Sequence, residues 1–102
     1  MLVEVKGRVY HRGDALPTGT IVFAPDTERG TRGPLAYGQV GPNGEFELST
    51  QGKMGCPPGR YKVTLAISRA YRVPDRYRDP DLSGQRVEVR AGVVNHCDIR
   101  LD

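Results

Sequence analysis

The segment between residues 69 and 83 holds the densest group of side chains suited to ligand binding. Guanidinium groups bind phosphate in a planar, paired fashion, and aromatic rings stack on bases or sugars. The segment is therefore a candidate site for a polyanion or a carbohydrate. Its candidate binding residues are Arg69, Tyr71, Arg72, Arg76, Tyr77 and Arg78.

Three aspartates in the same segment, Asp75, Asp79 and Asp81, offset most of this positive charge. The reading that we favour is that local Arg–Asp pairs order a long loop and leave little free charge. The aspartates also lack the glycine and the terminal glutamate of a calcium-binding loop. We therefore expect no metal, no cofactor and no nucleic acid partner.

Two cysteines, Cys56 and Cys97, are too few for a disulfide framework and lack metal-ligand spacing. Cys97 alternates in phase with Ile99 and Leu101, which predicts that it points into the core, whereas Cys56 precedes a strand. A disulfide between them remains open. The alternative that we favour is that they are free thiols, buried as small apolar groups.

Composition and length bound the class of protein. The chain has 102 residues, and 15 basic against 12 acidic side chains give a net charge of +3. This length predicts a single domain over residues 1–102. The basic and acidic residues are interspersed, which favours solubility over a dedicated polyanion partner. No stretch has the length and hydropathy of a membrane span, and no apolar leader follows Met1.

The candidate binding segment follows a stretch in which apolar and polar residues alternate. Pro57 and Pro58 are followed by Gly59. After this glycine, Tyr61, Val63, Leu65 and Ile67 alternate with polar residues. Such alternation predicts a strand with one buried face. Tyr61 should be buried and find a polar partner in a neighbouring turn. The same pattern predicts further strands over residues 2–10, 20–24, 35–40, 45–49, 85–90 and 94–101.

Turn signals separate these strands. Asn43-Gly44 between two alternating runs is a strong hairpin signal. Residues 26–34 are polar and glycine-bearing, which predicts a mobile surface loop. Together these features predict an all-β fold, an antiparallel Greek-key β-sandwich of about seven strands. The predicted core is Val3, Val5, Val9, Ile21, Phe23, Phe46, Leu48, Tyr61, Val63, Leu65, Val87, Val89, Ile99 and Leu101.

A series of short motifs in this order resembles one family of β-sandwich domains. The motifs are Val5-Lys6-Gly7-Arg8-Val9, residues 19–25, Gly41-Pro42-Asn43-Gly44-Glu45-Phe46, Pro57-Pro58-Gly59-Arg60-Tyr61-Lys62-Val63, Tyr77-Arg78-Asp79-Pro80 and residues 95–101. The chain is similar to transthyretin-like (prealbumin-like, carboxypeptidase regulatory-like) domains, especially those of planctomycete envelope lipoproteins. The resemblance implies a prealbumin-like sandwich in an exported, periplasmic or cell-envelope protein.

Two sharper possibilities involve chemistry at specific side chains. Some transthyretin-like proteins are 5-hydroxyisourate hydrolases that use histidines and an arginine; here His11 and His96 are the candidates, but the chain ends without the family's Tyr-Arg-Gly-Ser signature. Collagen-adhesin domains of similar fold form an isopeptide bond between a lysine and an asparagine under a carboxylate. Lys6, Asn95 and either Glu45 or Glu47 occupy comparable strands, although Lys6 alternates on the solvent face.

From the sequence we expect a non-enzymatic structural or protein-interaction module. Its partner would be another protein or the cell envelope. The loops at residues 26–34 and 69–83 are the predicted contact surfaces, because loops on a rigid sandwich commonly carry binding residues. A hydrolase, and polyanion or carbohydrate binding through the second loop, are the alternatives.

Overall fold

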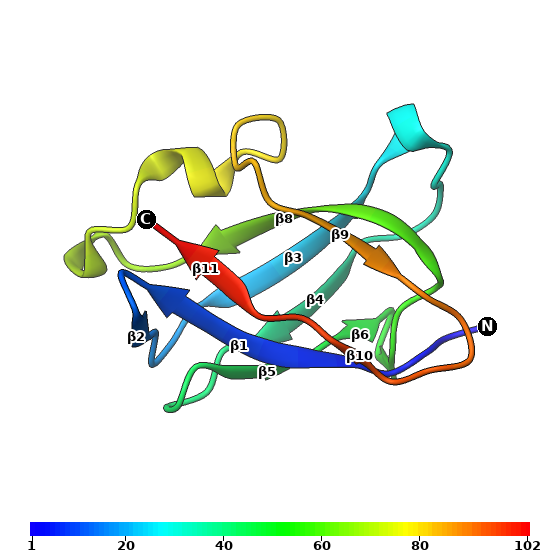
Figure 1. Ribbon diagram of the computed structural model, residues 1–102, viewed down its shortest axis with the longest axis horizontal. Coiled ribbons are helices and arrows are strands. Elements are labelled where there is room, and N and C mark those ends of the chain that lie inside the picture. The colour runs from blue at the N-terminus through cyan, green and yellow to red at the C-terminus, as the bar shows by residue number, and fades with distance from the viewer.

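The computed structural model describes residues 1–102 and consists of two β-sheets that enclose one hydrophobic core (Figure 1). The larger sheet has six strands in the order β7 (Lys53–Met54), β6 (Ser49–Thr50), β4 (Ala36–Gln39), β3 (Thr20–Pro25), β8 (Gly59–Ala66) and β9 (Arg86–Val89). The predicted all-β class is confirmed, and all strand pairs of the larger sheet are antiparallel.

The smaller sheet is built around β1 (Val5–His11). On one side β1 pairs with β5 (Glu45–Glu47) and β2 (Asp14–Ala15), and on the other with β10 (Asn95–His96) and β11 (Ile99–Leu101). The structure thus has eleven short strands where about seven were predicted. Two predicted strands, at residues 45–49 and 94–101, are each divided in two.

The pairing of β1 with the last two strands is parallel, with Val5 opposite Asn95 and Val9 opposite Ile99. These two pairs are the exception to the predicted antiparallel arrangement. The last stretch of chain runs in the same direction as the first and lies beside it. Alternation within a strand carries no information about the direction of its neighbour, so the sequence could not reveal this pairing.

The division of the last strand follows from a close contact with Gly7. The Cys97 amide donates to the carbonyl of Lys6 at 2.8 Å, and a side chain on Gly7 would place its Cβ only 1.8 Å from the Cys97 carbonyl oxygen. Only glycine leaves room for this approach of two backbones. Regular pairing resumes at Ile99.

The Asn43-Gly44 turn is present, but it does not close a regular hairpin. Gly44 has the left-handed φ of +81° that such turns require, and its amide donates to the carbonyl of Gly41 at 2.9 Å. The strand that follows first joins β1 as β5 and then crosses to the larger sheet as β6, where Ser49 pairs with Tyr37. The turn is therefore a corner between the two sheets.

Most of the predicted core is confirmed. Val3 and Val87 are only half-buried, because Val3 lies in an isolated bridge before β1 and Val87 on the edge strand β9. The remaining predicted members are buried. The core also contains six residues outside the predicted set: Leu16, Ala36, Val40, Cys56, Ile67 and Tyr77.

Three short 3-10 turns complete the chain: η1 (Thr27–Arg29), η2 (Arg69–Tyr71) and η3 (Asp75–Arg78). No helix is long and apolar enough to cross a membrane.

Candidate functional site

The predicted binding segment, residues 69 to 83, is folded against the end of the sandwich. It contains η2 and η3, which lie beside the end of β8 in Figure 1. The Ser68 hydroxyl caps η2 by accepting a hydrogen bond from the Ala70 amide at 3.3 Å. The Asp79 carboxylate accepts from the Asp81 amide at 2.8 Å. The segment is thus ordered by its own side chains.

The predicted Arg–Asp pairing is present in this segment. Arg69 Nη1 donates to both carboxylate oxygens of Asp75, at 2.8 and 2.9 Å, and Arg78 Nε lies 3.7 Å from the same carboxylate. The hydrogen bond from Arg69 holds the pKa of Asp75 below its usual value. Arg78 also donates to the carbonyl of Ile67, which ties η3 to β8. Both arginines already have acceptors within the chain.

Tyr77 was predicted to be a ligand-binding side chain, but its ring is buried in the core and cannot stack on a base or sugar. Its hydroxyl accepts hydrogen bonds from Arg76 Nη2 at 2.9 Å and from the Asp102 amide at 3.1 Å. Arg76 also donates to the Asp102 carboxylate at 3.1 Å. Tyr77 and Arg76 therefore fasten η3 to the residue that follows β11.

Tyr71 and Arg72 are the only members of the predicted set with no side-chain hydrogen bond or ion pair, and both are exposed. Arg72 has a left-handed φ of 56° at the end of η2. One free arginine and one tyrosine remain from the six candidates. The structure does not assemble the predicted set into one binding surface.

The two cysteines are free thiols. Cys97, predicted to point into the core, packs against it, and Cys56, predicted in the loop before a strand, is itself a core residue. Cys56 is fully buried and Cys97 only half-buried. Burial raises the pKa of both thiols; for Cys56 the polar hydroxyl of neighbouring Tyr61 partly offsets this effect. The same Tyr61 hydroxyl donates to the carbonyl of Pro57 at 2.7 Å, which confirms that this phenol ties its strand to a neighbouring turn.

The residues proposed for hydrolase chemistry lie apart. His96 is paired with Lys6 near the start of β1, whereas His11 is paired with Leu101 and Asp14 at its end. The Nε2 atom of His11 is buried without a hydrogen-bond partner. The structure thus does not bring the two histidines into one cavity.

The lysine and asparagine considered for an isopeptide bond also have other partners. Lys6 is half exposed and lies 3.6 Å from Glu4. The Asn95 side chain caps the turn between β9 and β10. It accepts from the Arg90 amide at 2.9 Å and donates to the carbonyls of Arg90 and Val93 at 3.0 and 3.2 Å. The Asn95 side chain therefore stabilises this turn.

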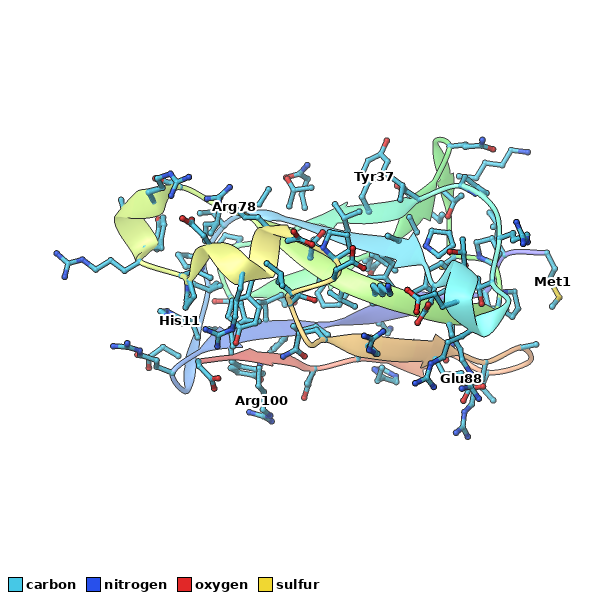
Figure 2. The ribbon with its side chains drawn as sticks, turned by 90° about the horizontal axis from the view of Figure 1, so that it is seen from above. Met1, His11, Tyr37, Arg78, Glu88 and Arg100 are labelled. Carbon is cyan, nitrogen blue, oxygen red and sulfur yellow. The ribbon has the colours of Figure 1, made fainter.

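The outer face of the smaller sheet is charged. Lys6 lies opposite Glu47, and Arg8 opposite Glu45. These side chains line an open groove of about 540 Å³ together with His96, Asp98 and Tyr10, whose ring packs under the guanidinium of Arg100 at 4.8 Å. Figure 2 shows Arg100 pointing away from the molecule on this face.

The outer face of the larger sheet is different, because a transverse row of uncharged side chains crosses it. Successive strands place Thr64 opposite Val22, Val22 opposite Tyr37, Tyr37 opposite Ser49 and Ser49 opposite Met54. We call these five residues the outer row. Tyr37 is 45% exposed and Met54 63% exposed. Figure 2 shows Tyr37 pointing outward from the sheet.

A third feature lies where β3 ends, and the sequence did not reveal it. Asp26, placed by the sequence in a mobile surface loop, is buried and forms ion pairs with Arg86 at 3.3 Å and Arg29 at 3.9 Å. Thr31, in the same loop, accepts a hydrogen bond from the Arg60 amide at 2.7 Å. The loop is thus attached to the sheet at two points. Asp26 and Arg86 are 60 residues apart, so no local pattern links them.

Comparison of the chain with protein-family models, curated proteins and solved structures found no match. The resemblance to transthyretin-like domains therefore stays a prediction. No three side chains of His, Cys, Asp and Glu lie together in a way that could hold a metal ion.

Proposed function

We propose that this chain is a non-catalytic β-sandwich module that binds another protein through the outer face of its larger sheet. We further propose that it belongs to an exported or cell-envelope protein, which rests on the transthyretin-like resemblance alone.

The observation that supports protein binding is the outer row. It crosses five neighbouring strands, β8, β3, β4, β6 and β7, without a charged side chain. Tyrosine and methionine, which provide its exposed apolar surface, are enriched in protein interfaces, whereas charged residues are depleted at their centres. Leu35, 52% exposed just before β4, extends the apolar surface.

The contrast between the two outer faces supports the choice of surface. The smaller sheet carries acids opposite bases on its central strand β1, as expected of a face in contact with water. The charged residues of the larger sheet, such as Arg60 opposite Glu88, lie towards β9, and the outer row contains none. A sheet face that exposes a tyrosine, a methionine and a leucine together is typical of a surface that another molecule covers.

The alternatives have less support. A hydrolase of the kind considered above needs its histidines in one site, but His11 and His96 pair with residues near opposite ends of β1. Polyanion binding by the segment 69–83 needs free arginines, but Arg69, Arg76 and Arg78 are engaged with acceptors of the chain itself.

Site-specific photo-crosslinking in cells of the source organism tests the proposal. A photo-reactive phenylalanine in place of Tyr37, or separately in place of Met54, should give the same covalent protein adduct. The matched control carries this residue in place of Arg8, which is exposed on the outer face of the smaller sheet. It should give no such adduct.

A charge placed in the outer row provides the second arm. Tyr37→Lys should abolish the adduct formed from position 54, because an unpaired charge at the centre of an interface opposes binding. It should leave the unfolding transition close to that of the parent protein, since Tyr37 is exposed. Adducts from position 8 alone, or an adduct from position 54 that survives Tyr37→Lys, would contradict the proposal.

A further inference from the structure

A small hollow lies between the end of β3 and the paired strands β8 and β9. It has a volume of about 240 Å³. Its charged lining residues are Asp26, Arg29, Arg60, Arg86 and Glu88, and Tyr61 and Val87 complete it. A hollow of this size accommodates a small ion or molecule rather than a polymer.

Asp26 has an unusual environment for a carboxylate in this hollow. It is only 2% exposed, and both arginine contacts, from Arg86 at 3.3 Å and Arg29 at 3.9 Å, reach its Oδ2 atom. Its Oδ1 atom is buried and has no hydrogen-bond partner. Because buried carboxylate oxygens nearly always accept hydrogen bonds, this oxygen is an acceptor that the side chains of the hollow leave unused.

The charge of the hollow restricts the chemistry of that donor. Three arginines against two carboxylates, 3 − 2, leave an excess of one positive charge. The guanidinium of Arg60 makes no hydrogen bond or ion pair within the chain, although its backbone amide donates to Thr31. Guanidinium groups bind tetrahedral oxyanions by paired hydrogen bonds. A cationic donor would be repelled here, which leaves a water molecule or an anion that carries a proton, and the excess positive charge favours the anion.

We propose that this hollow binds inorganic phosphate in a protonated form. The arginines donate to the unprotonated oxygens, and the P–OH group donates to the Asp26 carboxylate. Inorganic phosphate keeps at least one proton throughout the neutral pH range, whereas sulfate keeps none. An acceptor placed among arginines therefore selects phosphate over sulfate, because sulfate would bring an oxygen lone pair against the carboxylate.

This site contains no residue of the outer row, although both involve the larger sheet. Figure 2 shows Tyr37, at the centre of the outer row, and Glu88, in the lining of the hollow, on opposite sides of the molecule. Loss of phosphate binding and loss of the protein adduct are therefore independent results.

Isothermal titration calorimetry of the purified chain at pH 7.5 and constant ionic strength tests the inference. Inorganic phosphate should bind in a saturable manner, and sulfate at least about tenfold more weakly, the ratio expected for one charge-assisted hydrogen bond. Methyl phosphate separates the free ion from a phosphate ester. It loses its second proton above about pH 6, so it should bind weakly at pH 7.5 and more tightly at pH 5.5.

Two variants and a control assign the binding to this hollow. Arg60→Gln, at an exposed position, should weaken phosphate binding about tenfold. Asp26→Asn supplies a donor in place of an acceptor and should bring the phosphate-to-sulfate ratio close to one. Arg12→Gln removes an exposed arginine in the turn after β1, at the far end of the molecule, and should change neither affinity (Figure 1).

Circular dichroism checks the fold of each variant, and if Asp26→Asn does not fold, Arg60→Gln decides alone. Equal affinity of the parent protein for phosphate and sulfate would overturn the inference. So would phosphate binding that Arg60→Gln leaves unchanged, or the absence of any binding heat for phosphate.

Discussion

The hydroxyl of Tyr61 donates a 2.7 Å hydrogen bond to the carbonyl oxygen of Pro57, four residues earlier in the chain. The tyrosine ring is fully buried beside Phe23, with ring centroids 6.0 Å apart. This bond holds the proline turn that precedes β8 against the core. It gives a buried phenol the partner that it requires.

Removal of this hydroxyl should destabilise the protein. We expect Tyr61→Phe to lower the free energy of unfolding by about 1 to 2 kcal/mol, because the ring still packs but the buried hydrogen bond is lost. Urea denaturation followed by circular dichroism measures the change. Tyr10→Phe is the control, since the Tyr10 hydroxyl makes no hydrogen bond within the chain and its ring contact with Arg100 is retained. Equal stability of the two variants would contradict this role for Tyr61.

Gly7 should not tolerate a side chain. Its Cβ would lie 1.8 Å from the Cys97 carbonyl oxygen, and both atoms belong to paired backbones that cannot move apart without breaking β1 from β10. We expect Gly7→Ala to cost about 2 kcal/mol or more in the same measurement. Gly41→Ala, where the nearest atom would lie 3.6 Å away, should cost much less. A small effect at Gly7 would mean that the two strands are not so closely apposed.

The Arg69–Asp75 pair predicts a titration that NMR can follow. The pKa of Asp75 lies below its ordinary value of 3.8, first because of the hydrogen bond from Arg69 and then because of the positive charge of Arg69. Because the folded-state pKa is the lower one, the pair stabilises the fold above the ordinary value and loses this effect as the pH falls through the folded-state pKa.

Arg69→Gln should therefore raise the pKa of Asp75 towards 3.8. Carbon-detected NMR titration of the carboxylates measures it, with Asp81 as an internal control, since its pKa is lowered by Lys62 instead. The change in stability should be small, because both partners are exposed to solvent. An Asp75 pKa that Arg69→Gln leaves unchanged would refute the pairing in solution.

The two thiols should react slowly and unequally. Burial raises the pKa of Cys56 and of Cys97, so each has less thiolate at neutral pH than an exposed cysteine. In the folded protein, Ellman's reagent should react with half-buried Cys97 before Cys56, and both should react rapidly in denaturant. The single variants Cys56→Ala and Cys97→Ala assign the two phases. A chain with no reactive thiol in denaturant, purified without reductant, would indicate a disulfide instead.

The sequence predicted the strands well where one face is buried. Tyr61, Val63 and Leu65 follow a period of two that only a half-buried strand produces, and β8 runs through them as expected. The same pattern could not show where a strand changes sheet. Phe46 in β5 and Leu48 just after it are both buried, because a strand that crosses a corner keeps the same side towards the core.

The binding features were harder to predict because they join distant parts of the chain. Tyr77 lies in a polar segment with no periodicity, so nothing marked its ring as buried. The outer row combines residues of five strands, and only their register brings them together. Asp26 forms an ion pair with Arg86, which is distant in the sequence, so the local composition indicated only a polar loop.

The parallel pairing of β1 and β11 has a mechanical consequence. Figure 1 places Met1 and Asp102 at opposite ends of the molecule, whose longest dimension is 37 Å. A force that pulls these two ends apart acts along the strands and in opposite directions on two neighbours. The hydrogen bonds between them then carry the load together, in shear, instead of opening one after another. We therefore expect the fold to resist unfolding by a force that is applied between its two termini.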